Sequence, residues 1–196
     1  MLKYFFFLPI LLMSFSYKGN DPIDRIGVQG PLNFDGINYN LVWSDKPRDT
    51  YYIQEYLPEG ENVESFKQML TIHLFDVDIT AEDGVNRKIN ELKKRAETDP
   101  ICFYDVYKSP DGSEVMIDFT LGENKNGEQT IAEFNIYRYK LTATGSGKNA
   151  LLVYAYTERA YGESISGFLK DLKSVRPELT NKMSQTELPA IRLNPE

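Results

Sequence analysis

The residues best suited to chemistry are two carboxylates that follow an apolar run. Asp76 and Asp78 are separated by one residue, and Thr80 follows two positions later. Carboxylates in this arrangement can transfer a phosphoryl group, because one attacks phosphorus, the other moves a proton and Mg²⁺ neutralises charge. Their oxygens also suit Ca²⁺. One functional hypothesis is therefore a metal site or a phosphatase-like hydrolase centred on Asp76 and Asp78.

The run from Leu74 to Thr80 resembles the first motif of haloacid-dehalogenase-type phosphatases, an apolar strand ending in Asp-x-Asp-x-Thr. That resemblance implies that Asp76 is the nucleophile and Asp78 the acid/base. The chain departs from the family pattern, because Ile79 stands where glycine is usual and no acidic motif for Mg²⁺ follows downstream. The chain that follows also predicts antiparallel strands, whereas a doubly wound phosphatase needs alternating strands and helices.

A calcium loop is a second interpretation of the same residues. An EF-hand count fails at position six, which is Ala81, and at position twelve, which is Arg87. A looser carboxylate site that also uses Glu82 and Asp83 stays open. The structural alternative is a strand end followed by a helix N-terminus, where Asp, Thr and Glu are favoured by capping and by the helix dipole.

Other catalytic sets are incomplete. His73 is the only histidine and lies within a predicted strand, while Cys102, the only cysteine, lies in an apolar run typical of a small buried side chain. One of each cannot supply a His/Cys zinc site in a monomer. The run Gly145–Lys148 resembles a phosphate loop, but Thr142 occupies the position of its first glycine. We therefore predict no catalytic residue and no cofactor, and favour a non-enzyme.

Tyrosines form the remaining group of candidate functional residues. The chain has 13 Tyr, 11 Phe and one Trp. A tyrosine ring has an apolar body and a polar tip, which suits a half-wet ligand face. Candidate binding residues on the later strands are Tyr137, Tyr139, Tyr154 and Tyr156, together with Arg138. The alternative is that Tyr and Phe are simply frequent in strands.

The N-terminus has the pattern of a secretory signal peptide. Lys3 precedes an uncharged run, Tyr4 to Met13, and Ser14-Phe15-Ser16 then gives a small-x-small cleavage pattern. The apolar run is too short to span a bilayer. We predict a signal peptide over residues 1–16 with cleavage after Ser16. No cysteine lies at the junction, so we expect no lipid anchor.

Charge and cysteine content limit the partners and the compartment. Loss of Lys3 with the signal peptide takes the formal charge from −7 to −8. An acidic chain without a basic tract argues against nucleic acid and against an anionic membrane surface. One cysteine forms no internal disulfide, and the sequence has no Asn-x-Ser/Thr sequon. Together these features favour an exported bacterial protein, periplasmic or extracellular, without a membrane span.

The pattern of the mature chain predicts one domain. We expect a linker over residues 17–35, a single α+β domain over 36–186 and an irregular tail over 187–196. Seven strands and two amphipathic helices are predicted, with helices starting near Thr80 and Ile165 and strands near 37–43, 51–56, 69–75, 101–108, 114–121, 131–142 and 151–158. Short turns between successive strands give antiparallel pairs. We therefore expect a mostly antiparallel sheet of six or seven strands, with the two helices covering a face.

Two resemblances add to this interpretation. The runs Tyr51–Glu61 and Phe66–Ile72 resemble a segment of uncharacterised exported bacterial proteins. The order of elements resembles the Mog1/PsbP-like fold, a sheet flanked by helices whose members mostly act as binding or accessory proteins. The leading functional hypothesis is therefore an exported, non-catalytic domain that binds an unknown protein or small ligand.

Overall fold

The computed structural model describes residues 22–144 and 149–193. The predicted signal peptide and the run Gly145–Lys148 lie outside the described residues. The strands are β1 (Leu32–Phe34), β2 (Ile37–Arg48), β3 (Tyr51–Pro58), β4 (Gln68–Phe75), β5 (Phe103–Lys108), β6 (Glu114–Lys125), β7 (Glu128–Ala143) and β8 (Asn149–Tyr161). The helices are α1 (Ala81–Arg95), the short 3₁₀ turn η1 (Gly162–Ser164) and α2 (Ile165–Gln185).

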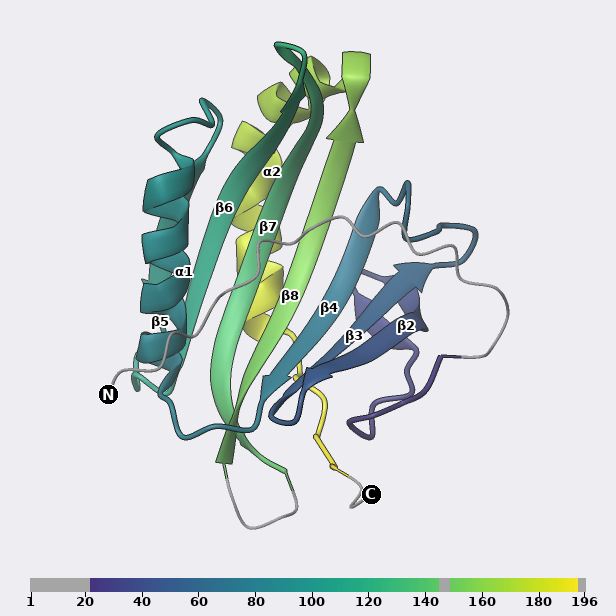
Figure 1. Cartoon of the computed structure of the whole chain (residues 1–196), viewed down its shortest axis with the longest axis vertical. Coiled ribbons are helices and arrows are strands. Elements are labelled where there is room, and N and C mark those ends of the chain that lie inside the picture. Colours follow the sequence, from purple (N-terminus) through teal and green to yellow (C-terminus); the bar gives the residue numbers. More distant parts are fainter. Residues whose placement is uncertain (1–21, 145–148, 194–196) are drawn as a thin grey trace.

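The strands form one antiparallel sheet in the order β1-β2-β3-β4-β8-β7-β6-β5. Strands β6, β7 and β8 are the longest neighbouring group and pair over most of their length (Figure 1). Because successive side chains point to opposite faces, each of these strands supplies two sets of residues. One set packs with α1 and the other with α2, so these strands are covered on both faces.

Helix α1 begins with a capping box at Thr80, where a helix start was predicted. The Thr80 hydroxyl accepts the Asp83 backbone N–H at 3.0 Å, and the Asp83 carboxylate accepts the Thr80 N–H at 3.1 Å. The Thr80 hydroxyl also donates to the Asp83 carboxylate at 2.7 Å, and this bond, with that from the Thr80 N–H, holds the pKa of Asp83 below its usual value. Val85 and Leu92 then pack against the first face of the sheet, which we call the α1 face. The main contacts of α1 fall on β5, β6 and β7.

Helix α2 covers the opposite face, which we call the α2 face. Leu172, Leu179 and Met183 are buried there against side chains of β6, β7 and β8. The helix continues through Pro177. None of the helices in the described parts of the chain has the length and apolar character needed to cross a membrane.

A charged cluster fixes α2 to the edge of the sheet. Asp118 on β6 is fully buried, and the Arg176 guanidinium donates to its two oxygens at 2.8 and 2.6 Å. The hydroxyls of Tyr107 and Thr180 donate to the same carboxylate at 3.1 and 3.3 Å. Arg176 also pairs with Asp105 on β5. The cluster therefore joins α2, β5 and β6 through a carboxylate that has no access to water.

The prediction of an α+β fold is confirmed, but three details differ. The sheet has eight strands because β1 lies in the expected linker. Ile26 and Phe34 from that segment are buried in the core, so residues 26–35 belong to the domain. Ile191 from the expected tail is buried beside them, and the Arg192 N–H donates to the Ile26 carbonyl at 2.8 Å. Both segments are mostly polar, so the sequence did not indicate that their few apolar residues are buried in the core.

The helices also differ from the expected arrangement. We expected them to cover a face together, whereas they lie on opposite faces of β6–β8. In Figure 1 the sheet separates α1 from α2. The long strands have apolar side chains in both alternating sets, and both sets need cover.

The first testable prediction concerns the buried carboxylate. Replacing Arg176 with Ala should lower the free energy of unfolding by about 3 kcal/mol, because Asp118 stays buried without its cation. Urea denaturation measures the change. Lys173→Ala, an exposed position on the same helix, should change stability by less than about 0.5 kcal/mol. Adding Asp118→Leu to Arg176→Met should recover most of the loss; an Arg176→Ala protein as stable as wild type would contradict the account.

Candidate functional site

The structure separates the four candidate tyrosines. Tyr137 and Tyr139 lie on the α1 face, whereas Tyr154 and Tyr156 lie on the α2 face. All four are at most 8% exposed. They therefore do not form the single half-wet face that the sequence suggested, since β7 and β8 pair in a register that offsets the two sets by one residue. Burial raises the pKa of each phenol well above its usual value.

Arg138 has a structural role in this arrangement. Its Nη1 donates to the carbonyls of Met183 at 2.9 Å and Thr186 at 2.7 Å, at the end of α2. Its Nε donates to Glu114 at 2.5 Å. These contacts satisfy carbonyls that a helix C-terminus leaves free. The guanidinium is thus occupied in holding α2 on the sheet.

Asp76 and Asp78 lie in the connection between β4 and α1. The Asp76 N–H donates to the Thr50 carbonyl at 2.8 Å, and Asp78 is exposed. Among the described residues, no three His, Cys, Asp or Glu side chains are grouped as metal ligands would be. Of the two expected additional ligands, Asp83 is engaged in the capping box with Thr80, and Glu82 pairs with Lys108 at 2.8 Å. The geometry thus gives the carboxylate hypothesis no additional ligand.

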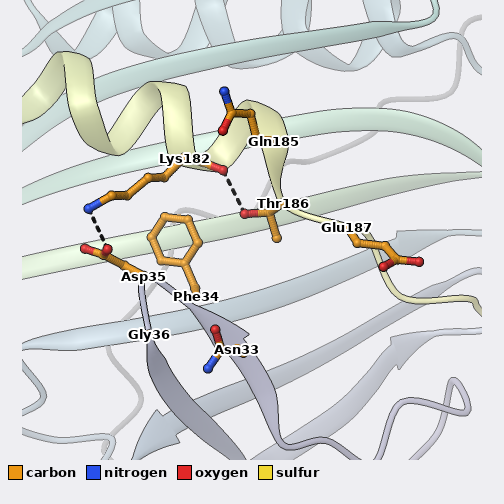
Figure 2. A pocket seen from close by; sticks show the side chains of 8 residues that line it. All are labelled: Asn33, Phe34, Asp35, Gly36, Lys182, Gln185, Thr186 and Glu187. Carbon is orange, nitrogen blue, oxygen red and sulfur yellow. Dashed lines mark hydrogen bonds and ion pairs between the residues drawn. The ribbon is translucent and has the colours of Figure 1, made fainter.

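An open hollow of about 540 Å³ lies between the β1–β2 turn and the end of α2 (Figure 2). It is lined by Asn33, Phe34, Asp35, Gly36, Lys182, Gln185, Thr186 and Glu187. Asp35 and Gly36 have φ of 52° and 76°, as a tight turn with left-handed residues requires. Lys182, the one cation among these lining residues, is shared by Asp35 and Glu178 at 2.5 and 2.6 Å. Its charge is therefore already neutralised.

A second candidate lies on the α1 face, beside α1. Glu55 on β3, Thr71 on β4 and Ala155 on β8 are direct neighbours in register. Thr157 and Asn135 are paired on β8 and β7, two residues further along the strands. We call these five residues the polar strip. Thr71 and Ala155 are small and lie between the longer side chains of Glu55 on β3 and Tyr137 on β7.

Asn135 is the unusual member of the polar strip. Its side chain is 3% exposed, and the Thr157 hydroxyl donates to its Oδ1 at 2.8 Å. Its Nδ2 has no hydrogen-bond partner. Turning the amide over leaves the oxygen unpaired instead, since Thr157 can satisfy only one of the two atoms. A buried polar group without a partner costs about 1–3 kcal/mol, so it needs an explanation.

Glu55 is the acidic end of the polar strip. Burial raises the pKa of its carboxyl to about 7, and the positive charge of Arg159 opposes this shift. Arg159 itself is paired with Glu133, with Nε donating at 2.7 Å, and lies 4.0 Å from the ring centre of Phe66. Near neutral pH, Glu55 therefore exists both with and without its proton.

Aromatic rings run along one side of the polar strip. Phe75 stacks on Tyr51 at 4.7 Å, and the Tyr51 hydroxyl lies 3.0 Å from His73 Nδ1. His73 lies 5.9 Å from Tyr137, between ring centres, and Tyr137 lies 5.0 Å from Phe119. We call these five residues the aromatic row.

Two charged groups border the aromatic row. Lys88 from α1 lies over the rings of Tyr137 and Phe119 at 5.3 and 5.5 Å and pairs with Glu91 at 2.9 Å. Burial and the charge of Lys88 lower the pKa of His73 to about 3, so its imidazole is neutral at physiological pH. The α1 face thus presents a neutral aromatic row beside a polar strip.

Sequence reasoning missed Asn135, Thr157 and Glu55. Each lies within a predicted strand, and nothing in the sequence distinguishes it from the other polar residues of the strands. Only the register of β7 on β8 brings Asn135 to Thr157. The one available signal was a polar residue at an inward position of an apolar strand, which Asn135 is. His73 was correctly placed within a strand beside Thr71 and Phe75.

Comparison with known proteins assigns the chain to a family. A protein-family model matches residues 26–188, which is most of the chain. The chain belongs to this family, which is uncharacterised. No curated protein and no solved structure matches the chain.

The second prediction concerns the raised pKa of Glu55. A carboxyl whose folded pKa exceeds its unfolded value of 4.5 stabilises the fold at low pH, and that contribution is lost as pH rises through about 7. Glu55→Gln should therefore match wild type near pH 5 and be more stable by about 2 kcal/mol at pH 8. Urea denaturation at both pH values measures this. If the free energy of unfolding changed equally in wild type and variant between pH 5 and pH 8, Glu55 would not titrate in this range.

Proposed function

We propose that this protein is an exported, non-catalytic domain that binds a small ligand at Asn135 of the polar strip, four of whose five residues are at most 8% exposed in the ligand-free chain. The observation that supports the proposal is the unpaired polar atom of Asn135, on the face of the sheet that carries the polar strip. A ligand that pairs with this amide would remove the free-energy cost that the unpaired buried group imposes on the free protein. The resemblance of the element order to the Mog1/PsbP-like fold, with its binding and accessory members, also favours this role.

Binding fits the site better than catalysis. His73 is neutral, its Nδ1 lies beside the Tyr51 hydroxyl, and the described residues give it no carboxylate partner. The Thr157 hydroxyl is committed to Asn135, and no general base contacts it within the described part of the chain. Nucleophilic catalysis needs a nucleophile and a base within hydrogen-bond reach of each other. The polar strip offers hydrogen-bond partners in fixed positions, which is what recognition requires.

The export part of the proposal gives a third prediction. Full-length protein produced in a bacterial host should be cut after Ser16, because the charged start, apolar run and small residues together form a signal peptide. N-terminal sequencing of the exported protein should therefore begin at Tyr17. Replacing Ser14 and Ser16 with Phe should leave uncut precursor. Accumulation of the full-length wild-type chain in the cytoplasm would contradict the proposal.

The binding part gives a fourth prediction. Replacing both Asn135 with Leu and Thr157 with Val removes both partners of the hydrogen bond and leaves no unpaired polar atom. We expect this double variant to be at least as stable as wild type without ligand, because the replacements are similar in shape and apolar. It should also lose the thermal shift that wild type shows in a screen of amino acids, dipeptides, nucleosides and sugars.

Asn181→Leu on α2 is the matched control, since it is exposed and lies on the other side of the sheet. It should keep every ligand-induced shift. A double variant destabilised by more than about 2 kcal/mol would indicate that Asn135 serves the fold instead. A ligand that shifts wild type and double variant equally would show that the site lies elsewhere.

A further inference from the structure

The edge of the sheet at β5 is exposed and carries apolar side chains. Strand β5 is the last in the strand order, and no strand of the described residues pairs with its outer side. Five of its six residues are exposed. Of the seven large apolar side chains that are exposed in the described residues, three lie on β5, namely Phe103, Val106 and Tyr107. We infer that two copies of this chain associate through this edge, with their β5 strands antiparallel.

The backbone of β5 points its unpaired groups outward at alternate residues. The Ser109 N–H donates to the Glu114 carbonyl at 3.1 Å, next to the pairs in which β5 lies in register on β6. In an antiparallel ladder only every second pair of residues exchanges hydrogen bonds, so the odd-numbered residues of β5 are bonded to β6. The N–H and C=O groups of Tyr104, Val106 and Lys108 therefore point away from the sheet. Such groups can pair with a further strand.

These outward groups complement a second copy of themselves in one register. When Val106 faces Val106 of the other copy, Tyr104 faces Lys108 on both sides, and each facing pair can exchange two hydrogen bonds. A shift of the register in one direction makes Asp105 face itself, and like charges directly opposite each other are destabilising. A shift in the other direction makes Tyr104 face Pro110, which has no N–H to donate. The register centred on Val106 avoids both losses.

The charged residues of β5 are compatible with this register. Charged side chains, lysine above all, protect many edge strands from pairing. Here the Lys108 ammonium pairs with Glu82 at 2.8 Å, and Asp105 pairs with Arg176 of its own copy. In the register centred on Val106, each lysine faces a tyrosine ring and each aspartate faces a tyrosine. No two like charges face each other directly, so the strand is complementary in charge to its own copy.

The small size of the paired surface predicts a weak dimer. The six residues of β5 are far fewer than the roughly 20–30 residues that each partner supplies to an interface of standard size. Both copies are also acidic and repel each other. We therefore expect a dimer that forms at high micromolar concentration and dissociates on dilution. This association does not depend on the proposed ligand.

Sedimentation velocity of the mature protein between about 5 and 500 μM tests the association. We expect the mean mass to rise with concentration from that of one copy towards that of two. Val106→Pro removes the central outward N–H but no bond to β6, and should weaken association at least about tenfold. Val106→Lys makes two ammonium groups face each other and should have the same effect. Leu141→Lys on β7 is the matched control, since Leu141 is 40% exposed and Val106 38%, and it should associate like wild type.

Cysteine trapping tests the register. In a Cys102→Ser background, Val106→Cys should form a disulfide-linked dimer on oxidation. Facing residues of a hydrogen-bonded pair lie about 5.5 Å apart between Cα atoms, a separation that a disulfide spans. Lys108→Cys is the control, because its two copies would lie four residues apart along the paired strands, about 13 Å. It should form the linked dimer at least about tenfold more slowly than Val106→Cys.

Three results would overturn the inference. The mass of a single copy at every concentration would show that the edge does not bind a second copy. Association that Val106→Pro and Val106→Lys leave unchanged would place the interface elsewhere on the molecule. A disulfide that forms as fast at Lys108→Cys as at Val106→Cys would show that the strands do not meet in this register. Thermal melting confirms that each variant is folded, and Val106→Lys alone decides if Val106→Pro does not fold.

Discussion

The fold depends on the burial of both faces of β6, β7 and β8. Each strand alternates between residues that pack under α1, such as Ile117, Tyr137 and Val153, and residues that pack under α2, such as Ile136 and Tyr154. A sheet buried on both sides needs large apolar side chains at nearly every position. This requirement explains why so many tyrosines of the later strands are core residues. On the α2 side, the buried pair of Asp118 and Arg176 joins the helix to β6 beneath it.

The sheet has more strands than the two helices cover. On the α2 face, the strands before β8 are covered by the N-terminal segment and β1, through Ile26, Val28 and Phe34, and by Ile191 near the C-terminus. On the α1 face, α1 packs against β5, β6, β7 and the part of β8 that carries Leu151 and Val153. Further along β8, and on β4 and β3, the same face carries Thr157, Thr71 and Glu55.

The sequence predicts much of this architecture and little of the site. Alternation and turn residues predicted seven of the eight strands, and Thr80 with Asp83 predicted the start of α1. β1 was missed because three residues among Gly, Pro and Asn give no periodic signal. The grouping of residues on each face of the sheet was not predicted. Alternation shows which residues of one strand share a face, whereas strand pairing decides which residues of different strands lie next to each other. Asn135 and Thr157 are 22 positions apart and become partners through register alone.

The proposed ligand contact is Asn135, whose Nδ2 has no hydrogen-bond partner. The most direct test is the side-chain amide signal of Asn135 in the ¹⁵N NMR spectrum of the mature protein, during titration with the compound that gives the largest thermal shift in the ligand screen. The account predicts that this signal moves with the backbone amides of Thr71, Ala155 and Thr157, while Asn181 stays unchanged. A titration that instead moves the signals of Asp35 and Lys182, and leaves Asn135 in place, would contradict it.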